Sequence, residues 1–461
     1  MEKLYTISDL PQLKRTQVRD NFKNYMNPGL CTYFGMLDFD KHYVKADGVN
    51  VWDSDDNCYL DFLGGYGSLN LGHNHPYVIE SLQKVATLPN LLQASMNGVA
   101  SALAYNLAQI TPGKLNNTFF CNSGAEAVEG ALKLARIATG RTRIISCVSS
   151  FHGKTMGALS LTGREKYHKG FEPMVPDCSM VEFGDLVGLE AQLKGNDVAA
   201  FIVEPIQGEG GIILPPAGYL NAAQKLCHQY GALFIADEIQ TGLGRTGKMF
   251  ACDHEGVEPD VMCLAKSLGG GIMPIGAVIT TQELWNKAYG GIEKCLLHTS
   301  TFGGNTWATA AGLAALEVLH NEKLPQHAAE MGDYLMSGLR TLQEKYPIIL
   351  DVRGQGLLVG IEFEQPAKGV LAKVAGAVNK LANEYLGSMV AGVLMNQYKI
   401  ITAYTLNNPN VIRLEPPLIV TKEQIDVVLN ALDDTFAKNR SIFGFSMASG
   451  KTFLSSVFGK K

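Results

Sequence analysis

Residues 118–138 read TFFCNSGAEAVEGALKLARIA, a short apolar strand that passes through Asn122, Ser123 and Gly124 directly into a helical pattern. Similar apolar runs recur along the chain with helical patterns between them: RIISCV at 143–148, VAAFIVE at 198–204, ALFIAD at 232–237, VMCLA at 261–265 and GAVIT at 276–280. Short buried strands that alternate with helices are typical of βαβ units. The sequence therefore predicts an α/β fold whose central sheet is mostly parallel and is covered by helices.

The two ends of the chain carry patterns of a different kind. Near the N-terminus, VNVWDSDDNCYLDFL at 49–63 contains the turn DSDDN and predicts a β-hairpin. Beyond residue 310, two long helical patterns precede strand-like segments at 351–364 and 399–420 and a last helical pattern at 421–439. We expect the two ends to share one small α+β domain. The predicted division is 1–70 for the N-terminal segment of the small domain, 71–310 for the large domain, 311–440 for the C-terminal part of the small domain and 441–461 for a tail.

The composition excludes several classes of protein. The chain has 461 residues, is 46% apolar and 18% charged, and carries a formal net charge of -5. These values argue against disorder, and the sequence has no basic stripe that would predict binding to nucleic acid. Nine cysteines without a C-x-x-C pair or a metal-type spacing predict a reducing, cytoplasmic location and no metal. No signal peptide or membrane span is expected, and the tail at 441–461 fits a packed or loosely ordered C-terminus better than a segment that binds a membrane surface.

The turn after the strand at 118–121 is a candidate anion site. Ser123 is a good N-cap, Gly124 lets a ligand approach the backbone, and the first-turn N–H groups that begin with Ala125 are free to bind. Together with the helix dipole, these groups attract phosphate. On this motif alone, an ordinary Ser-capped helix is the commoner interpretation.

Asp237 closes the strand ALFIAD, at the end where parallel sheets bind their ligands. An ionised, buried Asp needs a cationic partner such as a protonated ring nitrogen. As an isolated signal, an Asp that caps the next loop fits equally well.

Lys266 follows the strand VMCLA and precedes the glycine run at 269–271. A partly desolvated lysine has a lowered pKa and becomes a nucleophile for Schiff-base formation, whereas a lysine that reaches solvent from a strand end is the alternative. An imine-forming lysine, an Asp opposite a pyridine nitrogen and a phosphate held at a helix N-terminus are together the requirements of pyridoxal 5'-phosphate.

Six segments carry a resemblance to a known family: SGAEAVEGALKLAR, FHGKTMGALSLTG, EPIQGEGG, DEIQTGLGRTG, LAKSLGGGIMPIGA and HTSTFGGN. In this order they resemble the class III, ω-amino-acid type, pyridoxal-phosphate aminotransferases of fold type I, over roughly residues 25–440. Within that family, TPGKL before FFCNSG, GKMFACDHE and TLNNPNVIRLEPPL resemble the putrescine aminotransferases most, with the ornithine and acetylornithine enzymes next.

The resemblance implies a role for each cofactor residue. Lys266 would bind the cofactor aldehyde and shuttle the substrate proton, and Asp237 would pair with the ring nitrogen. Gln240 would lie near the 3′ oxygen, and Phe151 would stack on the ring face. Phosphate contacts would come from Ser123, Gly124, Ala125 and, across the interface of an obligate homodimer, Thr301 of the neighbouring subunit. His152 and Glu204 would support the site, although structural hydrogen-bonded roles are as plausible for both.

Substrate choice, by the same resemblance, depends on four residues. Arg413 would grip the α-carboxylate of 2-oxoglutarate or glutamate, and Glu209 would neutralise that arginine when the donor has no carboxylate there. Tyr66 aligns with a tyrosine of the ornithine pocket, although it could equally be a packing residue. Lys154 departs from the ornithine-type and acetylornithine-type pattern, which has arginine after F-x-G. Because lysine cannot make the two-pronged carboxylate contact, this departure favours diamine donors.

The sequence thus predicts a transaminase that passes the terminal amino group of a diamine, putrescine by preference, to 2-oxoglutarate. The products would be glutamate and 4-aminobutanal, which can cyclise to 1-pyrroline. The alternatives are ornithine or acetylornithine as donor, a non-catalytic regulator that keeps the fold, and an aminomutase or racemase.

Overall fold

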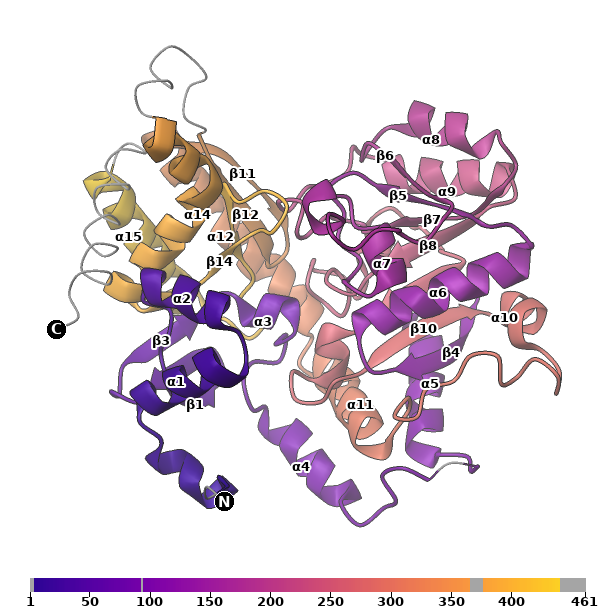
Figure 1. Ribbon diagram of the computed structural model, residues 1–461, viewed down its shortest axis with the longest axis horizontal. Helices are drawn as coiled ribbons and strands as arrows, with labels where there is room; N and C mark the ends of the chain where they lie inside the picture. Colours follow the sequence, from indigo (N-terminus) through magenta and orange to yellow (C-terminus); the bar gives the residue numbers. More distant parts are fainter. Residues whose placement is uncertain (1–3, 93, 365–375, 440–461) are drawn as a thin grey trace.

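The computed structural model describes residues 4–92, 94–364 and 376–439. Two lobes are visible: the middle of the chain forms the larger one, and the first and last described helices and strands lie in the smaller one (Figure 1). The α/β fold class predicted from the sequence is confirmed, whereas the tail at 441–461 lies outside the described residues. The exact domain limits stay a prediction.

A seven-stranded sheet forms the centre of the larger lobe. Its order in space is β4 (Leu115–Cys121), β10 (Gly276–Thr281), β9 (Val261–Leu264), β8 (Leu233–Asp237), β7 (Val198–Val203), β5 (Arg143–Cys147) and β6 (Cys178–Val181). The five strands from β9 to β6 are parallel, and only β10 runs antiparallel to its neighbours. The mostly parallel sheet was therefore predicted correctly. The reversal of β10 follows from its connection, since residues 265–275 are too few for the helical crossover that parallel strands need.

Helices cover both faces of this sheet (Figure 1). On one face α6 (Gly124–Thr139) packs against Ile202 and Ile235, and on the other α8 (Leu186–Leu193) and α9 (Tyr219–Gln229) pack against Phe201 and Phe234. Because neighbouring residues of β7 and β8 point to opposite covered faces, β7 is apolar along its whole length and β8 is apolar up to Asp237, its last residue. The other helices of the larger lobe are α4 (Pro76–Val85), α5 (Gly98–Ile110), α7 (Met156–Ser160), α10 (Gln282–Tyr289) and α11 (Thr306–Asn321).

Two four-stranded sheets form the smaller lobe. The first has the order β1 (Tyr43–Asp47), β2 (Asn50–Asp53), β3 (Cys58–Asp61) and β13 (Ile400–Ile401). The second has the order β11 (Ile349–Gln355), β12 (Leu358–Phe363), β15 (Val411–Leu414) and β14 (Ala403–Tyr404). The helices are α1 (Arg15–Tyr25), α2 (Pro28–Leu37), α3 (Gly64–Gly67), α12 (Leu324–Lys345), α14 (Gly376–Tyr398) and α15 (Lys422–Lys438). Since β13 pairs in parallel with β3, the two ends of the chain share one sheet, as expected.

The hairpin predicted at 49–63 is present as β2 and β3, and Asp53 closes its turn. The Asp53 carboxylate accepts hydrogen bonds from the backbone N–H groups of Asp55 and Asn57 at 3.0 Å each and from the Tyr59 hydroxyl at 2.8 Å. The segment 351–364 is not one strand but the antiparallel pair β11 and β12, because the chain reverses at Gly356, where φ is +56°.

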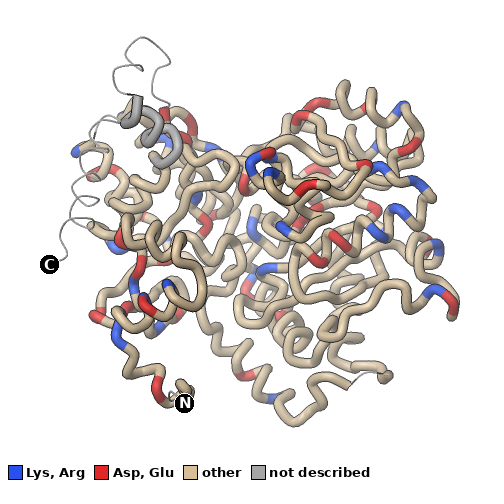
Figure 2. Tube along the Cα trace, viewed as in Figure 1, with Lys and Arg blue, Asp and Glu red and all other residues tan. Residues whose placement is uncertain are grey.

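No helix among the described residues is long and apolar enough to cross a membrane. Lys and Arg alternate with Asp and Glu over both lobes (Figure 2).

Candidate active site

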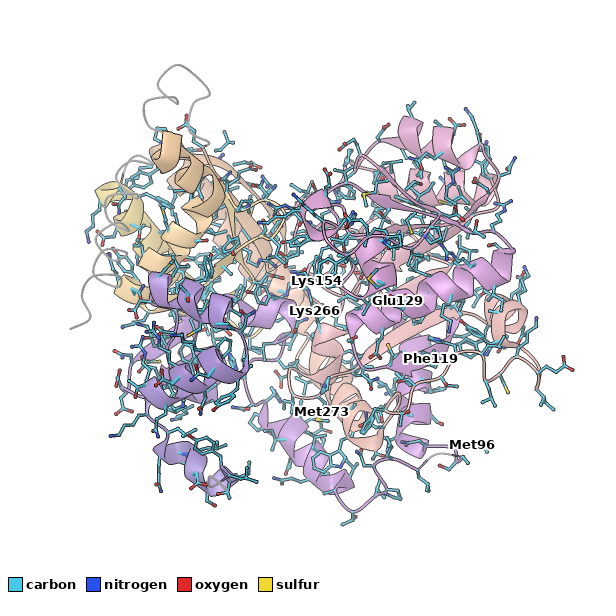
Figure 3. The ribbon with its side chains drawn as sticks, viewed as in Figure 1. Met96, Phe119, Glu129, Lys154, Lys266 and Met273 are labelled. Atoms are coloured by element: carbon cyan, nitrogen blue, oxygen red, sulfur yellow. The ribbon has the colours of Figure 1, made fainter. Side chains whose placement is uncertain are left out.

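A cavity of about 600 Å³ lies at one edge of the seven-stranded sheet. Its walls come from the residues that follow five strands: Ser123 after β4, Phe151 after β5, Glu204 after β7, Asp237 after β8 and Lys266 after β9. Parallel strands deliver their carboxyl ends to the same edge, which explains how segments far apart in the sequence meet here. Lys266 and Lys154 are both found between the two lobes (Figure 3).

The first turn of α6 forms one wall. The Ser123 hydroxyl accepts the backbone N–H of Glu126 at 3.2 Å, as expected of an N-cap. A Cβ atom on Gly124 would lie 2.9 Å from Cδ1 of Ile239, so this position has no room for a side chain. The N–H groups at the start of a helix have no intrahelical acceptor. Those of Gly124 and Ala125 therefore fit the phosphate of pyridoxal phosphate.

Asp237 and His152 form a buried pair that also lines the cavity. Nδ1 of His152 lies 2.7 Å from Oδ2 of Asp237, and Oδ1 of Asp237 accepts the backbone N–H of Ile239 at 3.2 Å. Burial would lower the pKa of His152, but the Asp237 carboxylate raises that pKa above its usual value. Within the described chain, Nε2 of His152 is buried without a hydrogen-bond partner. Besides contacting His152, the Asp237 carboxylate fits a protonated ring nitrogen of the cofactor, whose charge it would stabilise.

Glu204 joins two loops of the cavity. Its carboxylate accepts the backbone N–H of Phe151 at 2.8 Å and that of Gly208 at 3.0 Å. Burial raises the pKa of Glu204 to about 7. Glu204 thus holds Phe151, whose ring lines the cavity, which agrees with a supporting role.

Lys266 begins a short 3-10 turn directly after β9. Its φ of +46° lies in the left-handed region, which costs a non-glycine residue about 1 kcal/mol or more. Among the described residues its ammonium has no hydrogen bond or ion pair, and burial lowers the pKa of Lys266. A lysine of this kind has the reactivity that Schiff-base formation requires.

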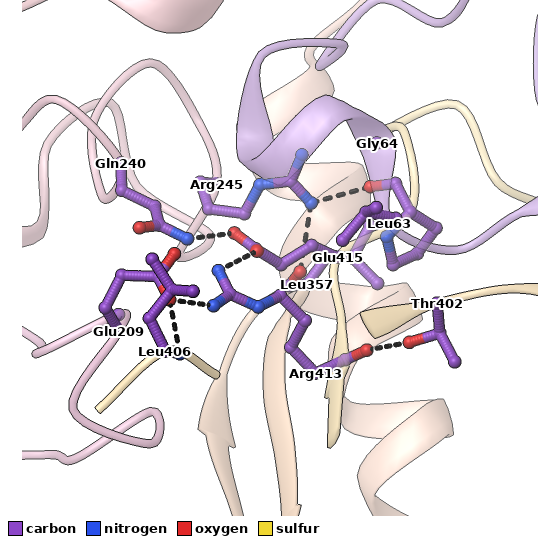
Figure 4. Close-up of polar contacts among 12 residues, drawn as sticks. Leu63, Gly64, Glu209, Gln240, Arg245, Leu357, Thr402, Leu406, Arg413 and Glu415 are labelled. Carbon is purple, nitrogen blue, oxygen red and sulfur yellow. Dashed lines mark hydrogen bonds and ion pairs between the residues drawn. The ribbon is translucent and has the colours of Figure 1, made fainter. Parts of the chain in front are cut away.

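A chain of four buried polar side chains begins at Gln240, which lines the cavity, and continues through Glu415, Arg413 and Glu209 (Figure 4). Nε2 of Gln240 donates to Oε1 of Glu415 at 2.8 Å, and Oε2 of Glu415 lies 3.3 Å from Nη1 of Arg413. Nη2 of Arg413 contacts Oε2 of Glu209 at 2.5 Å. Glu415 was not predicted from the sequence. The feature that could have identified Glu415 is its position two residues after Arg413, at the end of a strand. Residues i and i+2 of a strand point to the same face, so the two side chains could have been expected to lie close together.

The charges of this chain stabilise each other. Burial alone would raise the pKa of Glu209, but the Arg413 guanidinium lowers it below the usual value. Burial likewise opposes the charge of Arg413, yet Glu209 and Glu415 raise the pKa of Arg413. The Tyr66 ring, 45% exposed, lies 5.2 Å from the guanidinium carbon of Arg413. Tyr66 and Glu209 therefore both surround the predicted carboxylate-binding arginine.

Five predicted site residues do not line the cavity: Tyr66, Lys154, Glu209, Thr301 and Arg413. Two of these, Lys154 and Thr301, also lie outside the group of side chains around Arg413. Lys154 is exposed, with Nζ 4.7 Å from the Tyr167 ring and 5.9 Å from the Phe151 ring. Thr301 is exposed and does not line the cavity of its own chain in the described structure. Its role across a dimer stays a prediction.

Comparison with known proteins points to one family. A model of the class-III aminotransferases matches residues 37–436. An ornithine aminotransferase from Toxoplasma gondii ME49 is 32% identical, over 97% of this chain and 100% of its own, with a TM-score of 0.82. An acetylornithine aminotransferase from Elizabethkingia anophelis is 32% identical, over 86% of this chain and 94% of its own, with a TM-score of 0.72. An amine transaminase from an uncultivated Pseudomonas species, solved in a PLP-bound form, is 30% identical over the same shares, with a TM-score of 0.76.

Proposed function

Because the chain belongs to the class-III aminotransferase family, and so is a transaminase that depends on pyridoxal phosphate, we propose that its amino donor is a diamine, putrescine by preference, and its acceptor 2-oxoglutarate. The products are 4-aminobutanal, which can cyclise to 1-pyrroline, and glutamate. Two copies of the chain form the working unit, in which Thr301 of each reaches the phosphate site of the other.

One observation carries the choice of donor: Arg413 contacts two carboxylates, Glu209 and Glu415. With both in place, the arginine has no need of a substrate carboxylate, and the carboxylates favour a positively charged group nearby. A diamine brings such a group, because the amine that does not react stays protonated. The sequence departure at Lys154 supports the same choice.

The side chains of the cavity divide the work of the reaction. When bound, pyridoxal phosphate supplies an aldehyde that captures the amine and a ring that stabilises the carbanion. Ser123 and the N–H groups of α6 bind the phosphate, and Asp237 holds a proton on the ring nitrogen. Nζ of Lys266 takes the proton from the amine-bearing carbon of the donor and returns it in the next step. Phe151 covers the ring face and excludes water there.

The acceptor uses the other end of the site. Glu209 leaves Nη2 of Arg413, and a carboxylate of 2-oxoglutarate takes its place in a charge-assisted contact. Lys266 then moves the proton in the opposite direction, and the amino group leaves as glutamate. One site thus serves a cationic donor and an anionic acceptor in turn.

A second candidate function is the transamination of ornithine or acetylornithine. It is favoured by the likeness to the Toxoplasma enzyme over nearly the whole chain. In this case Glu209 would also withdraw for the donor, and the Tyr66 hydroxyl would contact the α-amino acid end.

A panel of donors decides between the two. The purified protein, loaded with pyridoxal phosphate, is given 2-oxoglutarate with putrescine, cadaverine, ornithine or acetylornithine, and glutamate is measured. We expect the highest kcat/KM with putrescine, and none with the Lys266→Ala control. A higher kcat/KM with ornithine or acetylornithine would replace the diamine proposal by the alternative.

A further inference from the structure

Glu415 is a fully buried carboxylate with two side-chain partners. One oxygen receives the amide N–H of Gln240 and the other lies near Nη1 of Arg413. Its backbone N–H donates to the carbonyl of Phe62 at 2.8 Å, and a Cβ atom on Gly67 would lie 3.0 Å from its Oε1. Glu415 is therefore fixed from several sides, by the segment that carries Phe62 and Gly67 and by Gln240, which follows β8 of the large sheet.

The two carboxylates occupy different edges of the Arg413 guanidinium. Glu415 lies at Nη1, whereas Glu209 lies at Nη2, and Nε is buried without a partner among the described residues. In a guanidinium, Nε–H and the adjacent Nη2–H point the same way and form one two-pronged edge. Glu415, at Nη1, thus leaves free the edge formed by Nε and Nη2, which can bind a carboxylate through two hydrogen bonds. Glu209 contacts only Nη2 of that edge.

We propose that Glu415 is a positioning residue that fixes this edge of Arg413 and disfavours bound carboxylates relative to cationic donors. The proposal rests on the proposed function and names the residue that sets the donor class at the same site. Glu209 can then act alone as the exchangeable partner, because Arg413 keeps Glu415 when Glu209 withdraws. A buried arginine left without any carboxylate would be strongly destabilised.

The charge of Glu415 reaches the reacting end as well. Burial lowers the pKa of Lys266, and among the charges that oppose this effect Glu415 is the strongest, followed by Glu209. Arg245, the other buried cation nearby, donates to the carbonyls of Leu357 and Pro416 and to Asn70. Burial lowers the pKa of Arg245, and Glu415 is the strongest charge that opposes this effect. Removing the charge of Glu415 therefore acts on Arg413, Arg245 and Lys266 as well as on charged substrates at this end.

The test uses the cofactor-loaded protein with Glu415→Gln, Glu415→Asp and, as a matched control, Glu283→Gln, which removes an exposed carboxylate paired with Lys287 on α10. The glutamine keeps the shape and can still accept from Gln240, whereas the aspartate keeps the charge. For each variant we would measure kcat/KM for putrescine and ornithine, KM for 2-oxoglutarate, and the thermal unfolding temperature.

We expect Glu415→Gln to lower kcat/KM for putrescine about tenfold and to lower KM for 2-oxoglutarate about threefold, because a removed negative charge acts oppositely on a cation and an anion. If the role of Glu415 were only structural, the variant would use both putrescine and 2-oxoglutarate less well. Glu415→Asp should keep the putrescine-to-ornithine ratio within about threefold, and Glu283→Gln should match the unchanged protein. An unchanged or higher KM for 2-oxoglutarate in Glu415→Gln, or a tenfold change of the putrescine-to-ornithine ratio in Glu415→Asp, would overturn the proposal.

The two proposals can fail separately. If the unchanged protein uses ornithine but not putrescine, the diamine proposal is wrong, and the KM for 2-oxoglutarate in Glu415→Gln still decides the role of Glu415. If Glu415→Gln gives no folded protein, the ratio measured for Glu415→Asp decides it.

Discussion

Replacing Arg413 with lysine would separate the two half-reactions. The guanidinium is fully buried and reaches two carboxylates, Glu209 at 2.5 Å and Glu415 at 3.3 Å. A lysine ammonium is a single point and cannot hold a substrate carboxylate through two parallel hydrogen bonds. Lysine nevertheless keeps a positive charge between the two acids, whereas alanine would leave both of them buried without a cation, at a cost of about 3–5 kcal/mol in stability.

The size of the effect follows from the hydrogen bonds lost. One charge-assisted hydrogen bond to the bound 2-oxo acid contributes about 1.5–3 kcal/mol. Since about 1.4 kcal/mol corresponds to a factor of ten, kcat/KM for 2-oxoglutarate should fall about 10- to 150-fold. The diamine makes no contact with Arg413 in the proposed mechanism, so its half-reaction should change by no more than about threefold.

Single-turnover absorbance of the cofactor measures each half-reaction separately. The donor half is followed after putrescine is mixed with the loaded protein, and the acceptor half after 2-oxoglutarate is mixed with the aminated form. Arg143→Lys, which alters an ion pair with Asp197 at the start of β5, serves as the control. Equal losses in the two halves of Arg413→Lys would refute the assigned role of Arg413.

Three further predictions concern other residues of the site. Lys266→Ala should abolish glutamate formation and leave the circular dichroism spectrum unchanged; turnover above background would exclude Lys266 as the covalent residue. Lys154→Arg should raise kcat/KM for ornithine relative to putrescine by about threefold or more, since arginine can grip a carboxylate with two hydrogen bonds, and an unchanged ratio would contradict this. Glu204, with a pKa of about 7 in the folded state against 4.5 ordinarily, binds more protons folded than unfolded between these pH values. The free energy of unfolding of the cofactor-free protein should therefore fall as pH rises from 4.5 to 7, by up to about 3 kcal/mol from this group. Urea unfolding at pH 5 and 7.5 tests this, and Glu204→Gln should lose that part of the pH dependence; a slope that persists unchanged would contradict it.

The central sheet was predictable because both of its faces are covered. Residues such as Phe201 and Ile202 point to opposite faces and are both buried, so the strand stands out as a continuous apolar run. The direction of β10 was not predicted, because the apolar pattern GAVIT does not show which strands it pairs with or in which orientation. Helix α14 was also missed: its sequence lies between two strand-like segments, and no helix was assigned there.

The site was predictable where a residue follows directly on a strand. Ser123, Asp237 and Lys266 each end or follow a visible strand, and the parallel arrangement brings them to one cavity. Glu415 was not found, because its contact with Gln240 joins residues 175 positions apart and depends on how the smaller lobe meets the sheet. Thr301 could not be placed by one chain alone, since its predicted partner belongs to a second copy.

The reversal of β10 has a consequence for the lysine that precedes it. Because β9 and β10 are neighbours in the sheet, the connection that carries Lys266 starts and ends in adjacent strands, with Leu264 paired to Ala277 across its mouth. A short loop anchored at both ends loses little further entropy when one of its residues is held in place. The short connection thus preorganises the amine of Lys266. A helical crossover would be many residues longer and would restrict the position of that amine less.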